Sequence, residues 1–109
     1  VVTNKGRRGA RKTIDGTGLR PHFSHVITRD EVEHPKPEPD MILHACELAG
    51  TDPKHTLLLG DTDNDILAAN AAGAASCLAT WGYSEHLDVL GRQATYSIDN
   101  PLELLTLIN

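Results

Sequence analysis

The sequence predicts an α/β fold, in which a parallel β-sheet carries helices on both faces. Short apolar runs alternate along the chain with segments of helical periodicity, which is the pattern of strands joined by crossover helices. The clearest unit spans residues 56–73, where an apolar run ends at Gly60 and an acidic turn leads into an alanine-rich helix. A bare apolar run is typical of a strand that is buried on both faces. Because ligands of open α/β sheets bind beyond the carboxyl ends of the strands, we expect a site at the acidic turn.

The composition is that of one soluble domain over residues 1–109, with 39% apolar and 23% charged residues. No apolar run approaches the roughly 18 residues of a membrane span, so we expect no membrane partner and a cytoplasmic protein. The two cysteines, Cys46 and Cys77, have no metal-ligand spacing and are interpreted as reduced core thiols. Basic residues cluster between positions 5 and 12. Without interleaved aromatic residues this cluster favours a solvated helix face over a nucleic-acid arm, and we expect no nucleic-acid partner.

In the first half of the chain the elements are short. Residues 1–3 read as the end of a strand, residues 7–18 as a weak helix interrupted by glycines, and residues 25–28 as a second strand. Three prolines then fix the backbone around Lys36. Asp40 is placed to cap a helix that ends at Gly50. Its inward positions follow the helical period, at Ile42, Ala45, Cys46 and Ala49.

The second half repeats strand and helix. After the strand at residues 56–59 and the helix that ends at Gly73, residues 75–80 read as another buried strand. Ser84 can cap a short helix to Leu90, and residues 95–98 form a last, edge strand. Pro101 opens a terminal helix whose inward face would carry Leu102, Leu105 and Ile108.

Three places with complementary chemistry fall at predicted strand ends, namely Thr3 with Asn4, Lys36, and Asp61 with Asp65. A hydroxyl and amides can donate to phosphate oxygens, a lysine supplies positive charge, and clustered carboxylates favour a hard cation such as Mg²⁺. Each also has a purely structural explanation. Thr3 is a common strand residue, Lys36 could be a solvated loop residue, and the carboxylates could cap the next helix. A helix cap accounts for one or two carboxylates, whereas three lie between residues 61 and 65.

The motifs that carry these residues resemble those of the haloacid dehalogenase superfamily of hydrolases. Thr3-Asn4-Lys5, the Lys-Pro-Glu-Pro run at residues 36–39, and Gly-Asp-Thr-Asp-Asn-Asp at residues 60–65 are similar to its second, third and fourth motifs. The surrounding sequence, including Trp-Gly-Tyr at residues 81–83, resembles the phosphoglycolate phosphatase-like branch. The resemblance implies a Mg²⁺-dependent phosphatase that acts on a small phosphorylated metabolite through an aspartyl-phosphate intermediate.

Carried over to this chain, the resemblance implies specific roles. Thr3 and the Asn4 amide would hold phosphate, and Lys36 would neutralise the charge of the phosphate and of the nucleophile. Asp61 would bind Mg²⁺ directly, and Asp65 would orient the metal ion or its water. Catalysis of this kind relies on charge placed against the transferring phosphoryl group.

One motif of the superfamily is absent from these 109 residues. Its nucleophile and general acid-base lie in an Asp-x-Asp-Gly-Thr motif on the first strand, before the motifs found here. Thr13-Ile-Asp15-Gly-Thr17 imitates the end of that motif but has a threonine in place of the nucleophile and lies between the second and third motifs. We therefore assign Asp15 no catalytic role.

The resemblance further implies an incomplete Rossmann-like core, without its first strand and without the cap domain. That strand would lie between the strands ending at Thr3 and Gly60, so two exposed sheet edges would favour self-association. The sequence thus predicts the carboxyl-terminal portion of a phosphatase, inactive by itself. The alternative is a non-catalytic Rossmann-like module that binds phosphate or a protein.

Overall fold

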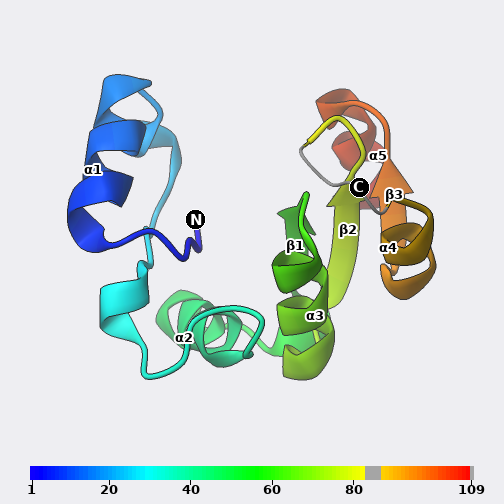
Figure 1. The fold of residues 1–109 in the computed structure, drawn as a ribbon, viewed down its shortest axis with the longest axis horizontal. Coiled ribbons are helices and arrows are strands. Elements are labelled where there is room, and N and C mark those ends of the chain that lie inside the picture. The colour runs from blue at the N-terminus through cyan, green and yellow to red at the C-terminus, as the bar shows by residue number, and fades with distance from the viewer. Residues whose placement is uncertain (83–86, 109) are drawn as a thin grey trace.

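The computed structural model describes residues 1–82 and 87–108, and one side of the molecule contains a three-stranded parallel sheet (Figure 1). The strands are β1 (Leu57–Gly60), β2 (Ala75–Ala79) and β3 (Tyr96–Ile98), in the spatial order β1-β2-β3. Helix α3 (Asp63–Ala72) lies between β1 and β2 in the chain, and α4 (Leu87–Gln93) precedes β3. The predicted α/β fold class is confirmed.

Both crossover helices lie on the same face of the sheet. Two successive right-handed crossovers that progress in one direction place their helices on one side, and α3 and α4 accordingly contact each other. Ile66 of α3, Leu78 of β2 and Leu90 of α4 are buried together there. Each fully buried side chain of this kind stabilises the fold by about 1.5–3 kcal/mol.

The opposite face of β2 carries Cys77, since successive strand residues point to opposite sides. The thiol is fully buried. Burial, and to a lesser extent the negative charge of Glu103, raises the pKa of the Cys77 thiol above its ordinary value. Glu103 belongs to the 3₁₀ turn η4 (Pro101–Glu103), which leads into the short helix α5 (Leu104–Ile108). The expectation of free core thiols is confirmed, because Cys46 and Cys77 are both free and buried.

The amino-terminal half forms a second group of elements beside the sheet (Figure 1). It contains α1 (Arg7–Gly16), α2 (Asp40–Ala49) and a single parallel bridge between Val2 and Ile27. Helix α2 joins this half to the sheet by packing on α3. The buried side chains of this junction are Ile27, Met41, Ile42, Cys46, Ala68, Ala69 and Ala74. Alanines on α3 allow the two helices to approach closely.

Strand β1 is less buried than the sequence predicts. Its outer residue Leu59 is 38% exposed, so the expectation of a strand buried on both faces is wrong. The reason is that β1 ends the described sheet and has no described strand on its outer side. The strand expected at residues 25–28 is likewise reduced to the one bridge at Ile27.

The carboxyl-terminal ends of the helices agree with the ends predicted from the sequence more closely than their amino-terminal ends do. Gly50 and Gly73 close α2 and α3 with φ of 65° and 80°, which glycine adopts without steric cost. Asp40, in contrast, does not cap α2, because Pro39 occupies that position. The Asp40 carboxylate instead accepts the backbone N–H of His34 at 3.2 Å. The proposed cap Ser84 lies outside the described residues, and α4 continues past Leu90 to Gln93.

The terminal segment, η4 and α5, does not bury the apolar face that the sequence predicts to point inward. Leu102, Leu105 and Ile108 are 75%, 53% and 60% exposed, so the prediction that they face inward is wrong. Their spacing crosses the junction between η4 and the five-residue α5, where the helical period changes from three to 3.6 residues. The structure describes no helix long and apolar enough to cross a membrane.

Candidate active site

Asp65 is the centre of a network at the carboxyl end of β1. It lies in the first turn of α3, where Thr62 is the N-cap and Asp65 completes a reciprocal capping box. Its Oδ2 accepts hydrogen bonds from the Asp61 N–H at 3.1 Å, the Thr62 N–H at 3.2 Å and the Thr62 hydroxyl at 3.0 Å. These donors fix the acidic turn against the start of the helix.

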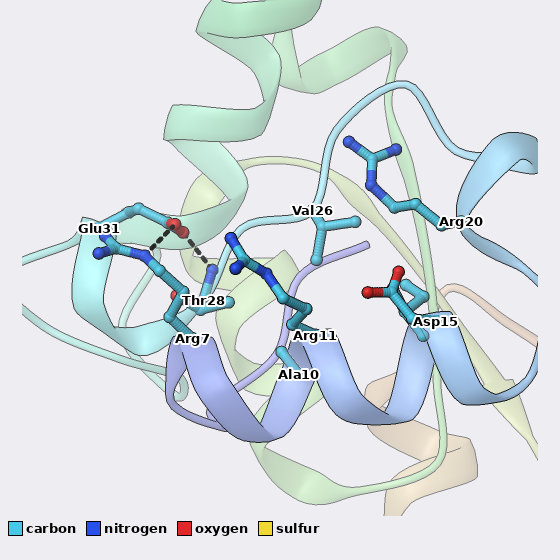
Figure 2. A pocket seen from close by; sticks show the side chains of 9 residues that line it. Arg7, Ala10, Arg11, Asp15, Arg20, Val26, Thr28 and Glu31 are labelled. Carbon is cyan, nitrogen blue, oxygen red and sulfur yellow. Dashed lines mark hydrogen bonds and ion pairs between the residues drawn. The ribbon is translucent and has the colours of Figure 1, made fainter.

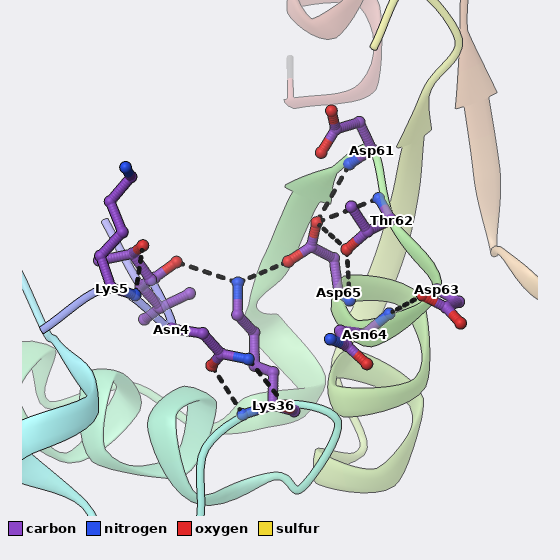
Figure 3. Close-up of polar contacts among 10 residues, drawn as sticks. Asn4, Lys5, Lys36, Asp61, Thr62, Asp63, Asn64 and Asp65 are labelled. Atoms are coloured by element: carbon purple, nitrogen blue, oxygen red, sulfur yellow. Dashed lines mark hydrogen bonds and ion pairs between the residues drawn. The ribbon is translucent and has the colours of Figure 1, made fainter. Parts of the chain in front are cut away.

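The other oxygen of Asp65 holds Lys36. Lys36 Nζ donates to Asp65 Oδ1 at 2.5 Å and to the Val2 carbonyl at 3.1 Å (Figure 3). Both charged side chains are largely buried, with exposures of 10% for Lys36 and 12% for Asp65. The lysine therefore joins the acidic turn to the amino-terminal segment, where Val2 is 34 residues before Lys36 in the chain.

The Asn4 side chain positions Lys36 by binding the backbone of Lys36. The Asn4 amide group donates to the Lys36 carbonyl at 2.8 Å, and its Oδ1 accepts the Lys36 N–H at 3.0 Å. This two-point contact fixes the loop that carries the lysine. The sequence indicated a role for Asn4 toward phosphate, but it contained no signal for this contact across 32 residues.

Asp61 follows directly after β1 and packs on Gly82. A side chain at Gly82 would overlap the Asp61 carboxylate, and one at Gly60 would overlap that of Asp65. Two glycines from different turns thus make room for the two carboxylates. Sequence reasoning used Gly60 only for the turn after the strand and gave Gly82 no role in the site, because this contact exists only once β1 and β2 are paired.

The structure brings Asn4, Lys36, Asp61 and Asp65 to one region (Figure 3). Thr3 adjoins this region, and its hydroxyl accepts the Lys5 N–H at 3.2 Å. Asp15, which the sequence argument set aside, lies on α1 and lines a different cavity. Of the residues that resemble catalytic motifs, the structure therefore assembles those assigned a role and separates the one that was not.

The donor set fits a Mg²⁺ ion only in part. Asp61 and Asp65 supply carboxylate oxygens, the ligands that Mg²⁺ prefers, and both oxygens of Asp65 accept hydrogen bonds from Lys36 or Thr62. Within residues 1–82 and 87–108, no three His, Cys, Asp or Glu side chains are grouped so that they could hold a metal ion. At least one further carboxylate beside Asp61 and Asp65 would be needed to complete such a group.

Comparison with known proteins agrees with this geometry. A sequence model of the family described as haloacid dehalogenase-like hydrolase matches residues 1–79. Phosphoglycolate phosphatase 1 of Pseudomonas aeruginosa is 34% identical over 105 residues, which are 96% of this chain and 39% of that protein. Pyrophosphatase PpaX of Oceanobacillus iheyensis is 28% identical over 99% of this chain and 50% of its own length.

Solved structures show the same relationship. The crystal structure of a predicted phosphoglycolate phosphatase from Haemophilus somnus superimposes with a TM-score of 0.90 at 28% identity. The superposition covers all of this chain, 100%, and 48% of the other. The chain thus spans half or less of the length of these relatives. Since the family model covers most of the residues and the assembled motifs, the chain belongs to the haloacid dehalogenase-like hydrolases.

Proposed function

We propose that this chain provides the phosphate- and metal-binding half of a Mg²⁺-dependent phosphomonoester hydrolase. The strongest support for this proposal is the buried contact of 2.5 Å between Lys36 Nζ and Asp65 Oδ1, beside Asp61 at the carboxyl end of β1. It holds a cation where the resemblance assigns charge neutralisation. The names of the relatives support a small phosphorylated metabolite as the substrate.

Each residue of the half-site then has a task. Lys36 attracts the phosphate dianion and stabilises the charge of the transferring group, while Asn4 and Asp65 keep the lysine in place. Thr3 and the backbone amide of Asn4 donate to phosphate oxygens. Asp61 would ligate Mg²⁺, which supplies further neutralisation of the phosphoryl oxygens when bound. Asp65 orients Asp61 through the Asp61 N–H and so acts as a positioning residue.

The nucleophile is proposed to come from outside these 109 residues. An aspartate oxygen would attack phosphorus, the ester P–O bond would break, and the alcohol would leave with a proton from a general acid. Water would then hydrolyse the aspartyl-phosphate and release inorganic phosphate. The open outer edge of β1 supports this arrangement, because a strand added there would end beside Asp61 and Lys36.

Phosphate release from phosphoglycolate in the presence of Mg²⁺ tests this proposal. The chain alone should release no phosphate above the buffer blank, because it lacks the attacking carboxylate. Turnover by the chain would show that the nucleophile lies within it. Turnover that also survives Lys36→Ala and Asp61→Ala would show that the site is elsewhere.

A further inference from the structure

A second polar cavity lies away from the half-site, between α1 and the segment 26–31. Its volume is about 220 Å³, and its polar lining comes from Arg7, Arg11, Asp15, Arg20, Thr28 and Glu31. Figure 2 shows these side chains directed toward the space between the helix and the segment. None of the four half-site residues Asn4, Lys36, Asp61 and Asp65 lines it.

Thr28 brings an unused hydrogen-bonding group to this cavity. The residue is 3% exposed. Its Oγ1 faces the Glu31 backbone N–H in a loose capping box but has no hydrogen-bond partner of ordinary geometry, and among the described residues no other buried side-chain oxygen or nitrogen is in this position. Buried polar groups are almost always paired. A hydroxyl can rotate to donate to a bound acceptor, so this atom indicates a ligand that carries one.

The charges of the lining favour a negatively charged acceptor. Three arginines face two carboxylates, and one of these, Glu31, already accepts the Thr28 N–H and lies 3.8 Å from Arg7 Nε. Arg20 donates one N–H to the Phe23 carbonyl at 2.7 Å and keeps others. Within the part of the chain that the structure describes, Arg11 makes no ion pair and no side-chain hydrogen bond. Guanidinium groups match the planar edge of carboxylate and phosphate oxygens.

We propose that this cavity is a second anion site, which binds the phosphate or carboxylate group of a small molecule between Arg11, Arg20 and Thr28 Oγ1. Arg11 and Arg20 supply the charge, and the Thr28 hydroxyl supplies a buried donor. Asp15, on the same wall, limits the bound charge and can accept a hydrogen bond from a hydroxyl or ammonium group of the ligand. The site is independent of phosphate binding at Lys36.

Amide proton–nitrogen NMR spectra of the whole 109-residue chain test this site. Inorganic phosphate and acetate are titrated separately at constant ionic strength, and the amides of Ala10, Arg11 and Thr28 are followed. Saturable shifts with either anion support the site, and the anion that binds more tightly identifies the preferred group. Linear shifts without saturation for both anions would overturn it. Amides of Asn4, Lys36 and Thr62 report the half-site, so failure of one site is distinguishable from failure of the other.

Two variants and a matched control test whether the anion binds in the cavity itself. Arg11→Gln should raise the dissociation constant for the tighter anion about tenfold, and Thr28→Val about threefold or more, since each removes a direct donor. Thr28→Val has nearly the same volume and removes only the loose capping contact of Oγ1 with the Glu31 N–H, so the chain should stay folded. Arg8→Gln removes the same charge from α1 at a residue that does not line the cavity and should change affinity less than twofold. Equal weakening by Arg8→Gln and Arg11→Gln would overturn the proposal in favour of diffuse attraction by the helix.

Discussion

The buried pair of Lys36 and Asp65 both stabilises the fold and organises the half-site. Breaking a buried ion pair at one partner leaves the other charge uncompensated and costs about 3–5 kcal/mol. Because the pair joins residues that are 29 positions apart, its loss also removes one tie between the two halves of the molecule, which then rely on the packing of α2 against α3. Stability and the proposed function therefore depend on the same contact.

Removal of the lysine charge should have a large effect on stability. Lys36→Met and Asp65→Asn should each lower the free energy of unfolding by roughly 3 kcal/mol, and the double variant should lose clearly less than the sum. Urea unfolding curves measure all three. Lys54→Met is the control, since Lys54 lies 3.9 Å from Asp52 with both side chains mostly exposed. It should change stability by less than about 1 kcal/mol. Strictly additive effects of Lys36→Met and Asp65→Asn would contradict a direct interaction.

The two glycines that border the carboxylates should not tolerate a side chain. In Gly60→Ala and Gly82→Ala the new methyl group would overlap Asp65 and Asp61, so backbone or carboxylate must move. We expect a loss of roughly 1–3 kcal/mol for each, as for other overpacked sites. Gly9→Ala in α1 is the matched control, because nothing lies within 4 Å of the added methyl group. Thermal unfolding should show a gain of about 0.5–1 kcal/mol there, and a gain in all three variants would refute the close packing of the carboxylates.

Among single residues, the sequence predicted the charged side chains that the structure brings together in the candidate site, but not the residues that support them. Asp61, Asp65 and Lys36 follow apolar runs or prolines, and this local context indicates strand ends. The clamp made by Asn4 and the space left by Gly82 depend on segments that meet only in the folded chain. No local pattern encodes such contacts, so they could not be predicted.

Among the strands, the position of each strand in the sheet decided whether the predicted burial was correct. β2 is paired on both sides and is almost fully buried, as its apolar sequence indicates. β1 has an equally apolar sequence, yet Leu59 is 38% exposed, because no described strand pairs with the other side of β1. The sequence predicts that a strand is suited to burial, whereas its neighbours decide whether burial occurs. The exposed leucines of η4 and α5 follow the same rule.

Cys77 in β2 should make the free energy of unfolding decrease at alkaline pH. Its pKa is raised in the folded state, mainly by burial, above an ordinary value of about 9.0. The folded protein therefore retains the thiol proton where the unfolded chain releases it. The contribution to stability is fully present below pH about 9.0 and is lost as the pH rises through the folded pKa.

Urea unfolding at a series of pH values checks this dependence. Above pH about 9.0, wild-type stability should fall more steeply than that of Cys77→Ala, which has no thiol to ionise. Cys77→Ala is less stable at every pH because of the cavity, so the slopes and not the absolute values are compared. Parallel curves for the two proteins would show that the thiol does not contribute.

At the scale of the whole molecule, the open edge of β1 is the feature that most needs a partner. Exposed apolar edge strands pair with other chains unless charges or bulges prevent it. β1 reads Leu-Leu-Leu-Gly and carries no charge. We therefore propose that the isolated chain self-associates through this edge.

Sedimentation velocity at increasing concentration measures this association. The wild-type chain should form dimers or larger species, and Leu59→Lys should shift it toward monomer because a charge on an edge strand opposes pairing. Leu43→Lys on α2 is the control, since Leu43 is similarly exposed, at 44% against 38% for Leu59, but lies on a helix. Association that is unchanged by Leu59→Lys, or a chain that stays monomeric, would rule out pairing through β1.

The proposed phosphate and Mg²⁺ half-site of Lys36, Asn4 and Asp61 can be tested by a titration followed by amide NMR. Inorganic phosphate is added to the chain with and without Mg²⁺, for the wild type, Lys36→Met and Asp61→Asn. We expect saturable shifts at Asn4, Lys36 and Thr62 and tighter phosphate binding with Mg²⁺. Binding should be lost in Lys36→Met, and the Mg²⁺ effect should be lost in Asp61→Asn. Absence of saturable shifts at these amides in a folded wild-type chain, or shifts that persist in Lys36→Met, would contradict the proposed half-site.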